Sequence, residues 1–247
     1  MITGIFHQGS GLGNQLHRYI ATRILALDKG YDFSMIAPEL FKGSSFMDLD
    51  MGMPNNTSWV IEKPTGKIIV DDVWEEWDKF CYDPDFNFVE DNTIIDGNFE
   101  DERYFEHRMA EIDKWLHVEP LDIPNNLCVI GFRGGEFYAI PELGLPKEYF
   151  DRGIEIMKKI NPNMRFEVHT DDPSLAKQFF PYLIIRDIGQ NWRSMRFAQY
   201  AIIANSSFYI LPRLLSGGLT IAPRYWNRYN TKKWDYPQNY YKSFKYV

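Results

Sequence analysis

The sequence predicts an α/β fold in two halves, each with a parallel sheet covered by helices. Short apolar runs alternate with segments of helical spacing, which is typical of such sheets. A glycine-rich turn follows the first apolar run, and a segment rich in proline and asparagine interrupts the pattern near the middle of the chain. With 247 residues, 45% of them hydrophobic, the chain is long enough for two compact halves.

The first half begins with a βαβ unit. Ile2 to Phe6 reads as a strand, and the turn "HQGSGLGNQLHRY" follows it. Apolar residues then recur at helical spacing up to Gly30, and a second strand is expected from Tyr31 to Ile36. The buried stripe of this helix is expected at Leu16, Ile20, Ile24 and Leu27. Residues 38–66 are expected to be irregular. Further strands are expected from Lys67 to Val70 and from Thr93 to Asp96, followed by a helix over 99–116 that is capped by Asp101.

The segment "VEPLDIPNN", residues 118–126, is the best candidate linker. It divides the chain into a domain of residues 1–120, a domain of residues 121–226 and a tail of residues 227–247. Two Rossmann-like halves with a cleft between them fit the order of elements. The second half is expected to contain strands Leu127 to Phe132, Met164 to His169, Leu183 to Ile185 and Leu219 to Ala222. Helices are expected from Pro146 to Ile160 and from Ser194 to Ile203, and two more are expected to begin after Asp172 and after Ser207.

Composition excludes several classes of protein. The net charge is −7 without a basic block, which argues against a nucleic-acid surface. No apolar stretch approaches the roughly 18 residues that cross a bilayer, and Met1 begins a strand rather than a charged leader, so we expect a cytoplasmic protein. The cysteines, Cys81 and Cys128, are expected to be buried thiols. Nothing in the sequence specifies an oligomeric state.

The C-terminal tail is rich in aromatic and basic residues. Aromatic rings stack on sugar faces, and the charge would suit an anionic glycan or a peripheral contact with a membrane. The alternative is that the tail packs back on its domain and buries its aromatic rings.

The glycine-rich turn suggests a close approach of the backbone to a phosphate. The dinucleotide fingerprint G-x-G-x-x-G has Asn14 here in place of its last glycine, while Asp28 and Asp32 lie near the distance of its acidic residue. An NAD(P)-dependent sugar-nucleotide enzyme is therefore one alternative. A tight turn without a ligand is another.

Five segments, in order, resemble a known family. "GLGNQL", "DGNFEDERYF", "VIGFRGGEF", "HTDD" and "MRFAQYAIIANSSF" followed by "IAPRYW" are similar to the motifs of the α-1,2-fucosyltransferases, glycosyltransferase family 11, and the first is similar to the "GNQ" of protein O-fucosyltransferases. The resemblance covers most of residues 1–226. It implies a GT-B fold, with two Rossmann-like domains facing each other across a cleft.

The resemblance also implies an activity: transfer of fucose from GDP-fucose to a glycan hydroxyl, with inversion and without metal or another cofactor. Arg133 matches the first motif arginine, whose planar fork can hold two phosphate oxygens of the leaving group. Catalytic roles are expected for Arg133, Glu136 and Asn14. Donor binding is expected of Gly11, Gly13, Asn14, Gln15, Arg133, Asn191, Asn205, Ser206, Ser207 and Phe208.

The sequence departs from the family at several motif positions. Gly131 replaces the motif histidine, Gly134 its second arginine and Glu136 its aspartate, Ile210 and Leu211 replace a tryptophan pair, and Asn191 stands near an aspartate that reads guanine. These losses keep a third alternative open, a glycan-binding relative without activity. The proton acceptor is unassigned: Glu136 is the candidate aligned with the family, and His7 and His17 lie by the glycine turn.

Overall fold

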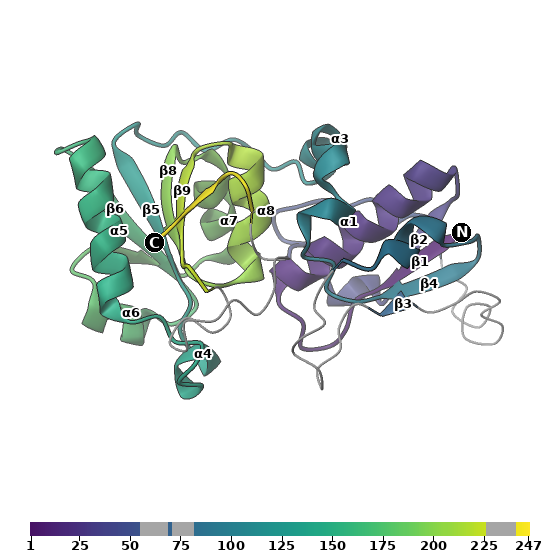
Figure 1. Cartoon of the computed structure of the whole chain (residues 1–247), viewed down its shortest axis with the longest axis horizontal. Coiled ribbons are helices and arrows are strands. Elements are labelled where there is room, and N and C mark those ends of the chain that lie inside the picture. The colour runs from purple at the N-terminus through teal and green to yellow at the C-terminus, as the bar shows by residue number, and fades with distance from the viewer. Residues whose placement is uncertain (55–68, 71–81, 226–240) are drawn as a thin grey trace. The chain divides into compact units, whose positions relative to one another are not determined.

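The structure, a computed structural model, describes residues 1–54, 69–70, 82–225 and 241–247. The chain divides between His117 and Val118 into two compact units (Figure 1). Each unit has its own sheet, and the paired strands within each sheet are parallel. The α/β class and the two parallel-sheet halves predicted from the sequence are confirmed.

Unit 1 contains a four-stranded sheet in the order β2-β1-β4-β3. Its long helix α1 follows β1, packs on β1 and β2, and ends at Gly30, whose left-handed φ of 68° closes the last turn. The predicted stripe of α1 is buried except for Leu27, which is exposed. The elements of unit 1 are β1 (Ile2–Ile5), α1 (Leu12–Lys29), β2 (Phe33–Ile36), η1 (Pro38–Leu40), β3 (Ile69–Val70), η2 (Pro84–Phe88), β4 (Thr93–Asp96), η3 (Glu102–Tyr104), η4 (Glu106–Arg108) and α3 (Met109–Trp115).

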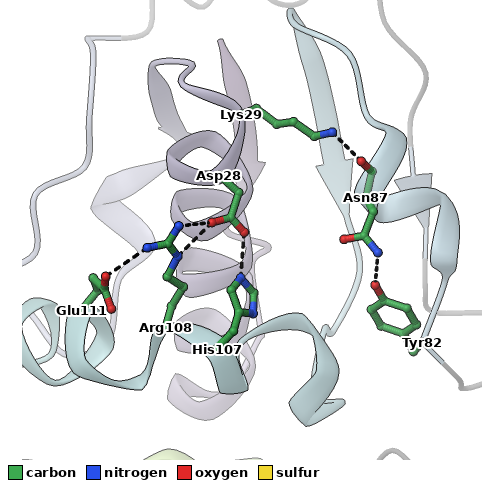
Figure 2. Close-up of polar contacts among 7 residues, drawn as sticks. All are labelled: Asp28, Lys29, Tyr82, Asn87, His107, Arg108 and Glu111. Atoms are coloured by element: carbon green, nitrogen blue, oxygen red, sulfur yellow. Dashed lines mark hydrogen bonds and ion pairs between the residues drawn. The ribbon is translucent and has the colours of Figure 1, made fainter.

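Polar contacts join the C-terminal end of α1 to two later segments (Figure 2). Both carboxylate oxygens of Asp28 are engaged: Oδ2 contacts His107 Nε2 at 2.7 Å, and Oδ1 accepts from Arg108 Nη2 at 2.6 Å. On the adjacent side, Lys29 donates to the backbone oxygen of Asn87. These contacts fix the end of α1 against η2 and η4.

Unit 2 contains a six-stranded sheet in the order β10-β9-β8-β5-β6-β7, the strand order of the Rossmann fold. Figure 1 shows α5 on one side of this sheet and α7 and α8 on the other. The elements are β5 (Leu127–Phe132), α4 (Glu136–Ala139), α5 (Lys147–Ile160), β6 (Arg165–Thr170), α6 (Pro173–Phe179), β7 (Leu183–Ile185), α7 (Ile188–Phe197), β8 (Tyr200–Ile203), α8 (Ser207–Ser216), β9 (Leu219–Ala222) and β10 (Phe244–Tyr246).

The last residues of the chain belong to the sheet of unit 2. Strand β10 pairs with β9, and Tyr241 and Phe244 are buried. These two aromatic residues therefore pack into the unit rather than facing a membrane or a sugar. Residues 226–240 of the tail lie outside the described residues, and the peripheral membrane contact stays a prediction. In the described part of the chain, no helix combines the length and apolar character that crossing a bilayer requires.

The single helix predicted over 99–116 is wrong in its first half. The segment forms the two 3₁₀ turns η3 and η4 before α3 begins. Phe99 has a left-handed φ of 52°, which no helix accommodates, and its ring packs edge-on against Tyr104 at 5.3 Å. Asp101 caps the short turn η3 through Arg103 N at 2.9 Å rather than a long helix. The aromatic packing therefore outweighs the helical spacing of the sequence.

The helix predicted from Ser194 to Ile203 is wrong in its second half. Helix α7 begins earlier, at Ile188, and ends at Phe197, and residues 200–203 form strand β8 between β5 and β9. Ala201, Ile202 and Ile203 are fully buried. A short apolar run fits a buried strand as well as a helix, so the spacing alone could not distinguish them.

Candidate active site

The loops after β5 and β8 lie where the connections of the unit 2 sheet change direction. From β5 the chain proceeds outward through β6 to β7, and it then returns to the other side of β5 as β8. Ligands of open α/β sheets bind beyond the carboxyl ends of the strands at such a switch point. The segments after these strands are "RGGEF" and "ANSSF", two of those that resemble the family. A backbone hydrogen bond from Ala204 N to Gly131 O, 2.8 Å, joins the two strand ends.

Arg133 stands directly after β5 with its guanidinium between two carboxylates. One Nη atom donates to Asp171 Oδ2 and the other to Glu136 Oε1. The guanidinium carbon also lies 5.2 Å from the ring centroid of Phe137. Arg133 is 28% exposed, Asp171 35% and Glu136 67%. Arg133 and Glu136, both predicted to be catalytic, are therefore in direct contact with each other.

The loop after β6 fixes the two glycines that follow Arg133. Gly134 N donates to Asp171 Oδ1 at 2.9 Å, and Gly135 N donates to Asp172 Oδ2 at 3.3 Å. Asp172 also caps α6 by accepting from Leu175 N, and this contact is the main cause that lowers the pKa of Asp172. A Cβ at Gly134 would lie 2.4 Å from Asp172 Cβ. The position of the family's second arginine therefore has no room for a side chain.

Gly131, at the position of the family's histidine, is closed off in a similar way. A Cβ there would lie 2.7 Å from Cε1 of Tyr209 and 2.9 Å from the terminal carbon of Met195. Tyr209 is buried, and burial raises the pKa of its hydroxyl. The tyrosine ring fills the space beside β5, so a side chain larger than that of glycine has no room at position 131.

We expect the Gly131→Ala variant to lose about 1–3 kcal/mol of unfolding free energy, the usual cost of overpacking a core. The added methyl group would press on a buried tyrosine ring that cannot move aside. Urea denaturation measures this loss. Gly144→Ala is the matched control, because a Cβ there would lie 3.2 Å from the Tyr138 ring. Equal stability of the two variants would contradict the close packing at Gly131.

Helix α8 begins at the other side of the switch point. Ser206 is its N-cap and makes no side-chain capping hydrogen bond, and the first turn, which includes Ser207 and Phe208, contains no acidic residue. The positive end of the helix dipole therefore has no carboxylate of that turn against it. Asn205 is buried and donates to Leu143 O at 3.0 Å, which holds the loop before the helix. Phe208 packs edge-on against Trp192 at 5.9 Å.

Asn191 lies in a buried chain of polar contacts. Its Oδ1 atom faces Nδ1 of His169 at 2.7 Å, and Nε2 of His169 faces Glu167 Oε1 at 2.8 Å. The side-chain oxygen of Asn191 is thus used inside unit 2. The role of Asn191 in reading guanine stays a prediction.

In unit 1, the glycine turn leads from β1 into α1. Gly9 has a left-handed φ of 84°, which glycine adopts without strain, and Gly11 is the N-cap of α1. A Cβ at either position would meet no atom of the described residues within 4 Å. Gly13 is buried in the first turn of α1. Asn14, in the same turn, donates to Asn98 Oδ1 at 3.2 Å rather than capping the helix.

Gln15 points into the unit. Its Nε2 atom donates to Leu40 O at 2.7 Å and its Oε1 atom accepts from Lys42 N at 2.9 Å, and the residue is 1% exposed. These contacts fix the segment after β2. Its donor-binding role stays a prediction, and its described contacts are structural.

The two histidines beside the glycine turn differ sharply. His17 is fully buried, contacts Gly13 O at 2.9 Å, and burial lowers its pKa to about 4. It cannot reach a substrate, so the suggestion that it is a base is wrong. His7 is 44% exposed, and its Nε2 atom lies 2.8 Å from Oδ1 of Asp96 at the end of β4. Arg18 Nη1 lies 3.4 Å from the same oxygen.

Sequence reasoning noted His7 but missed Asp96 and Arg18 as its neighbours. A signal existed, since His7 follows β1 and Asp96 ends the predicted strand Thr93 to Asp96. Only the strand order makes these ends adjacent, because β4 pairs with β1 despite the long separation in sequence.

The acidic residues of the dinucleotide alternative lie at the wrong edge of the sheet. Asp28 is in the last turn of α1 and Asp32 precedes β2, so both lie before the strand whose carboxyl end would carry a ribose ligand. Both oxygens of Asp28 are engaged by His107 and Arg108 (Figure 2). Neither residue can serve the role that the fingerprint gives its acid.

Among residues 1–54, 69–70, 82–225 and 241–247, no group of three or more His, Cys, Asp or Glu side chains could hold a metal ion. Asp171 and Asp172 accept from backbone N–H groups instead. Asp71, Asp72 and Cys81 lie outside the described residues. Cys128 is a buried free thiol, and burial raises its pKa.

Comparisons with known proteins give no family model and no curated protein that matches this chain. Similar solved structures include fucosyltransferase NodZ from Bradyrhizobium, with 12% sequence identity, a TM-score of 0.49, and coverage of 87% of this chain and 92% of that one. A family 9 glycosyl transferase from Veillonella parvula has 13% identity and a TM-score of 0.49, over 100% of this chain and 85% of that one.

Proposed function

We propose that this protein is an inverting glycosyltransferase that transfers a sugar, fucose from GDP-fucose, to a hydroxyl of a glycan. One observation carries the proposal. Two of the segments that resemble the α-1,2-fucosyltransferases follow β5 and β8, at the switch point of a sheet with Rossmann strand order.

Arg133 is proposed to stabilise the leaving nucleoside diphosphate. Negative charge develops on the phosphate as the bond to the sugar breaks, and a guanidinium can hold two of its oxygens. The contact with Glu136 is the one a phosphate would replace, because Glu136 is the more exposed of the two carboxylates. Exposed ion pairs contribute only about 0–1 kcal/mol, so this exchange costs little. Asp171 would keep the guanidinium in place.

The start of α8 is proposed to bind the same diphosphate. Backbone N–H groups of a helix N-terminus point at an anion placed there, and the helix dipole favours its charge. Ser206 and Ser207 would add hydroxyl donors. Guanine recognition by Asn191 and donor binding by Asn14 and Phe208 remain parts of the proposal that rest on the resemblance.

A second candidate, a glycan-binding relative without activity, is favoured by the state of Arg133. Both ends of its guanidinium contact carboxylates, and Gly131 and Gly134 have no room for the side chains that the family carries. This candidate predicts glycan binding without cleavage of any donor.

A donor panel tests both candidates. GDP-, UDP- and dTDP-sugars are incubated with the intact chain and with mixed glycans, and nucleotide release is measured. The glycosyltransferase proposal expects release from GDP-fucose above all. Thermal shift with GDP, UDP and NAD adds a binding measurement, since a ligand at 100 times its Kd stabilises by about 2.7 kcal/mol. Release from none of the donors would contradict the proposal, and stabilisation by NAD alone would favour the dinucleotide alternative.

We expect donor cleavage to continue in excess EDTA at the rate without chelator. The proposed leaving-group charge is met by Arg133 and the start of α8, so no divalent ion is needed for it. Nucleotide release with EDTA, and with EDTA followed by excess Mg²⁺ or Mn²⁺, measures this. Activity that disappears with EDTA and returns with either ion would contradict the prediction.

A further inference from the structure

A histidine–carboxylate pair lies at the carboxyl ends of strands β1 and β4 in unit 1. Strands β1 and β4 are neighbours, and the chain leaves β1 toward β2 on the side away from β4. His7 follows β1 and Asp96 ends β4, so the pair lies where a ligand of an open α/β sheet is expected. Gly9 and Gly11, where an added Cβ would meet no described atom within 4 Å, follow His7 closely in the chain.

The contacts of the pair orient the imidazole. Asp96 Oδ1 lies 2.8 Å from Nε2 of His7, and a carboxylate only accepts, so Nε2 carries a proton and, in the neutral ring, Nδ1 bears the lone pair. Arg18, 8% exposed, places a cation 3.4 Å from that carboxylate oxygen. Its Nη2 atom donates to Asn98 Oδ1 at 3.3 Å. Within the described residues, no hydrogen bond to Nδ1 of His7 is found.

We propose that His7 is the proton acceptor of the transfer reaction and that Asp96 is its positioning residue. The inference rests on the proposed glycosyltransferase function. The acceptor is then a neutral polyol, such as a glycan, whose reacting hydroxyl donates to Nδ1 of His7. As that oxygen bonds to the anomeric carbon of the donor, its proton passes to Nδ1. The electron pair of the broken carbon–oxygen bond leaves with the nucleoside diphosphate, and His7 later returns its proton to water.

The chain contains a matched control for this pair. His107 lies 2.7 Å from Asp28 and is 48% exposed, close to the 44% of His7 (Figure 2). Asp28 is in the last turn of α1, whereas His7 lies before the first, and an 18-residue helix is about 27 Å long. His7 and His107 each contact a carboxylate and are similarly exposed, but they lie at opposite ends of α1.

The test compares wild type, His7→Gln and His107→Gln in two measurements. Calorimetry measures GDP binding, and transfer of tagged fucose from GDP-fucose to an array of neutral glycans measures the reaction. We expect His7→Gln to bind GDP as wild type does and to lower kcat by about 10²-fold or more, the usual contribution of a general base. His107→Gln should transfer as wild type does.

A pH profile separates a chemical role from a structural one. The side chain of glutamine does not ionise, so a limb of the wild-type kcat profile that reports the base should be missing in His7→Gln. Free imidazole should restore part of the rate of His7→Ala. Asp96→Asn should lower kcat with little change in KM, because the ring loses its orientation.

The outcomes distinguish the two proposals. Transfer by His7→Gln at the wild-type rate, with transfer by wild type intact, would overturn the role of His7 and leave the proposed function standing. Wild type that transfers to no glycan and cleaves no donor would overturn both.

Discussion

Replacing Arg133 by lysine should lower kcat for donor cleavage by about 10² to 10³, with a smaller rise in KM for the donor. Removing one donor from an oxyanion site typically costs this much in rate. Lysine keeps the charge but offers a single point in place of the planar fork. If the two bonds to the phosphate strengthen as the sugar leaves, their loss affects the transition state more than the bound donor.

The control for Arg133→Lys is Arg165→Lys. Arg165 is an exposed arginine of the same unit at the start of β6, so it lies at the edge of the sheet opposite the carboxyl ends of the strands. The Arg165→Lys variant should cleave the donor as wild type does. Circular dichroism confirms that both variants fold. A folded Arg133→Lys protein with normal kcat would remove Arg133 from the site and leave "RGGEF" as a structural turn.

Four strands of the two sheets could be predicted with their bounds. Thr93–Asp96, Leu127–Phe132, Leu183–Ile185 and Leu219–Ala222 have the predicted bounds, since each is a short apolar run ended by turn or polar residues. A helix begins after Asp172 and another ends at Gly30, as predicted, because both roles depend on local backbone geometry.

What the sequence could not specify depends on contacts between distant residues. Tyr200–Ile203 is a strand because β5 and β9 flank it. The resemblance predicts a phosphate-binding role for Arg133, yet Asp171 meets it from the loop after another strand. The pairing of His7 with Asp96 likewise depends on strand order. Motif reasoning located the segments, and only the topology of each sheet brought their side chains together.

Arg213 is the clearest example of a residue whose role depends on distant contacts, since no sequence motif predicts it. It lies in α8, is 1% exposed, and burial lowers its pKa to about 10. Its hydrogen bonds close the end of α7 and the start of β9. They are Nη1 to Met195 O and Ala198 O at 2.8 Å each, Nη1 to Ser216 Oγ at 3.1 Å, Nε to Thr220 Oγ1 at 2.9 Å and Nη2 to Leu219 O at 3.5 Å.

These contacts explain why α7 stops where β8 must begin. The carbonyl groups of Met195 and Ala198 belong to the end of a helix, where backbone oxygens lack partners within the helix. A buried guanidinium supplies the missing donors in a fixed plane. A side chain that takes no part in the proposed chemistry therefore joins the end of α7 to the start of β9.

We expect Arg213→Met to lower the stability of unit 2 by about 3 kcal/mol or more, because several buried oxygen atoms lose their donor at once. Methionine fills similar space but leaves the buried oxygen atoms without a donor, and each unsatisfied group costs about 1–3 kcal/mol. Hydrogen exchange of the amides of β8 and β9 measures the loss in unit 2 separately from unit 1.

Arg196→Met is the matched control for Arg213→Met. Arg196 is half-buried in α7 and donates to Leu215 O at 2.7 Å. Its replacement should cost about 1 kcal/mol, the value of a typical hydrogen bond. Equal protection of β8 and β9 in the two variants would show that the Arg213 network does not hold α7 and β8 in place. Much faster exchange in Arg213→Met, up to loss of the folded unit, is the result that the buried network requires.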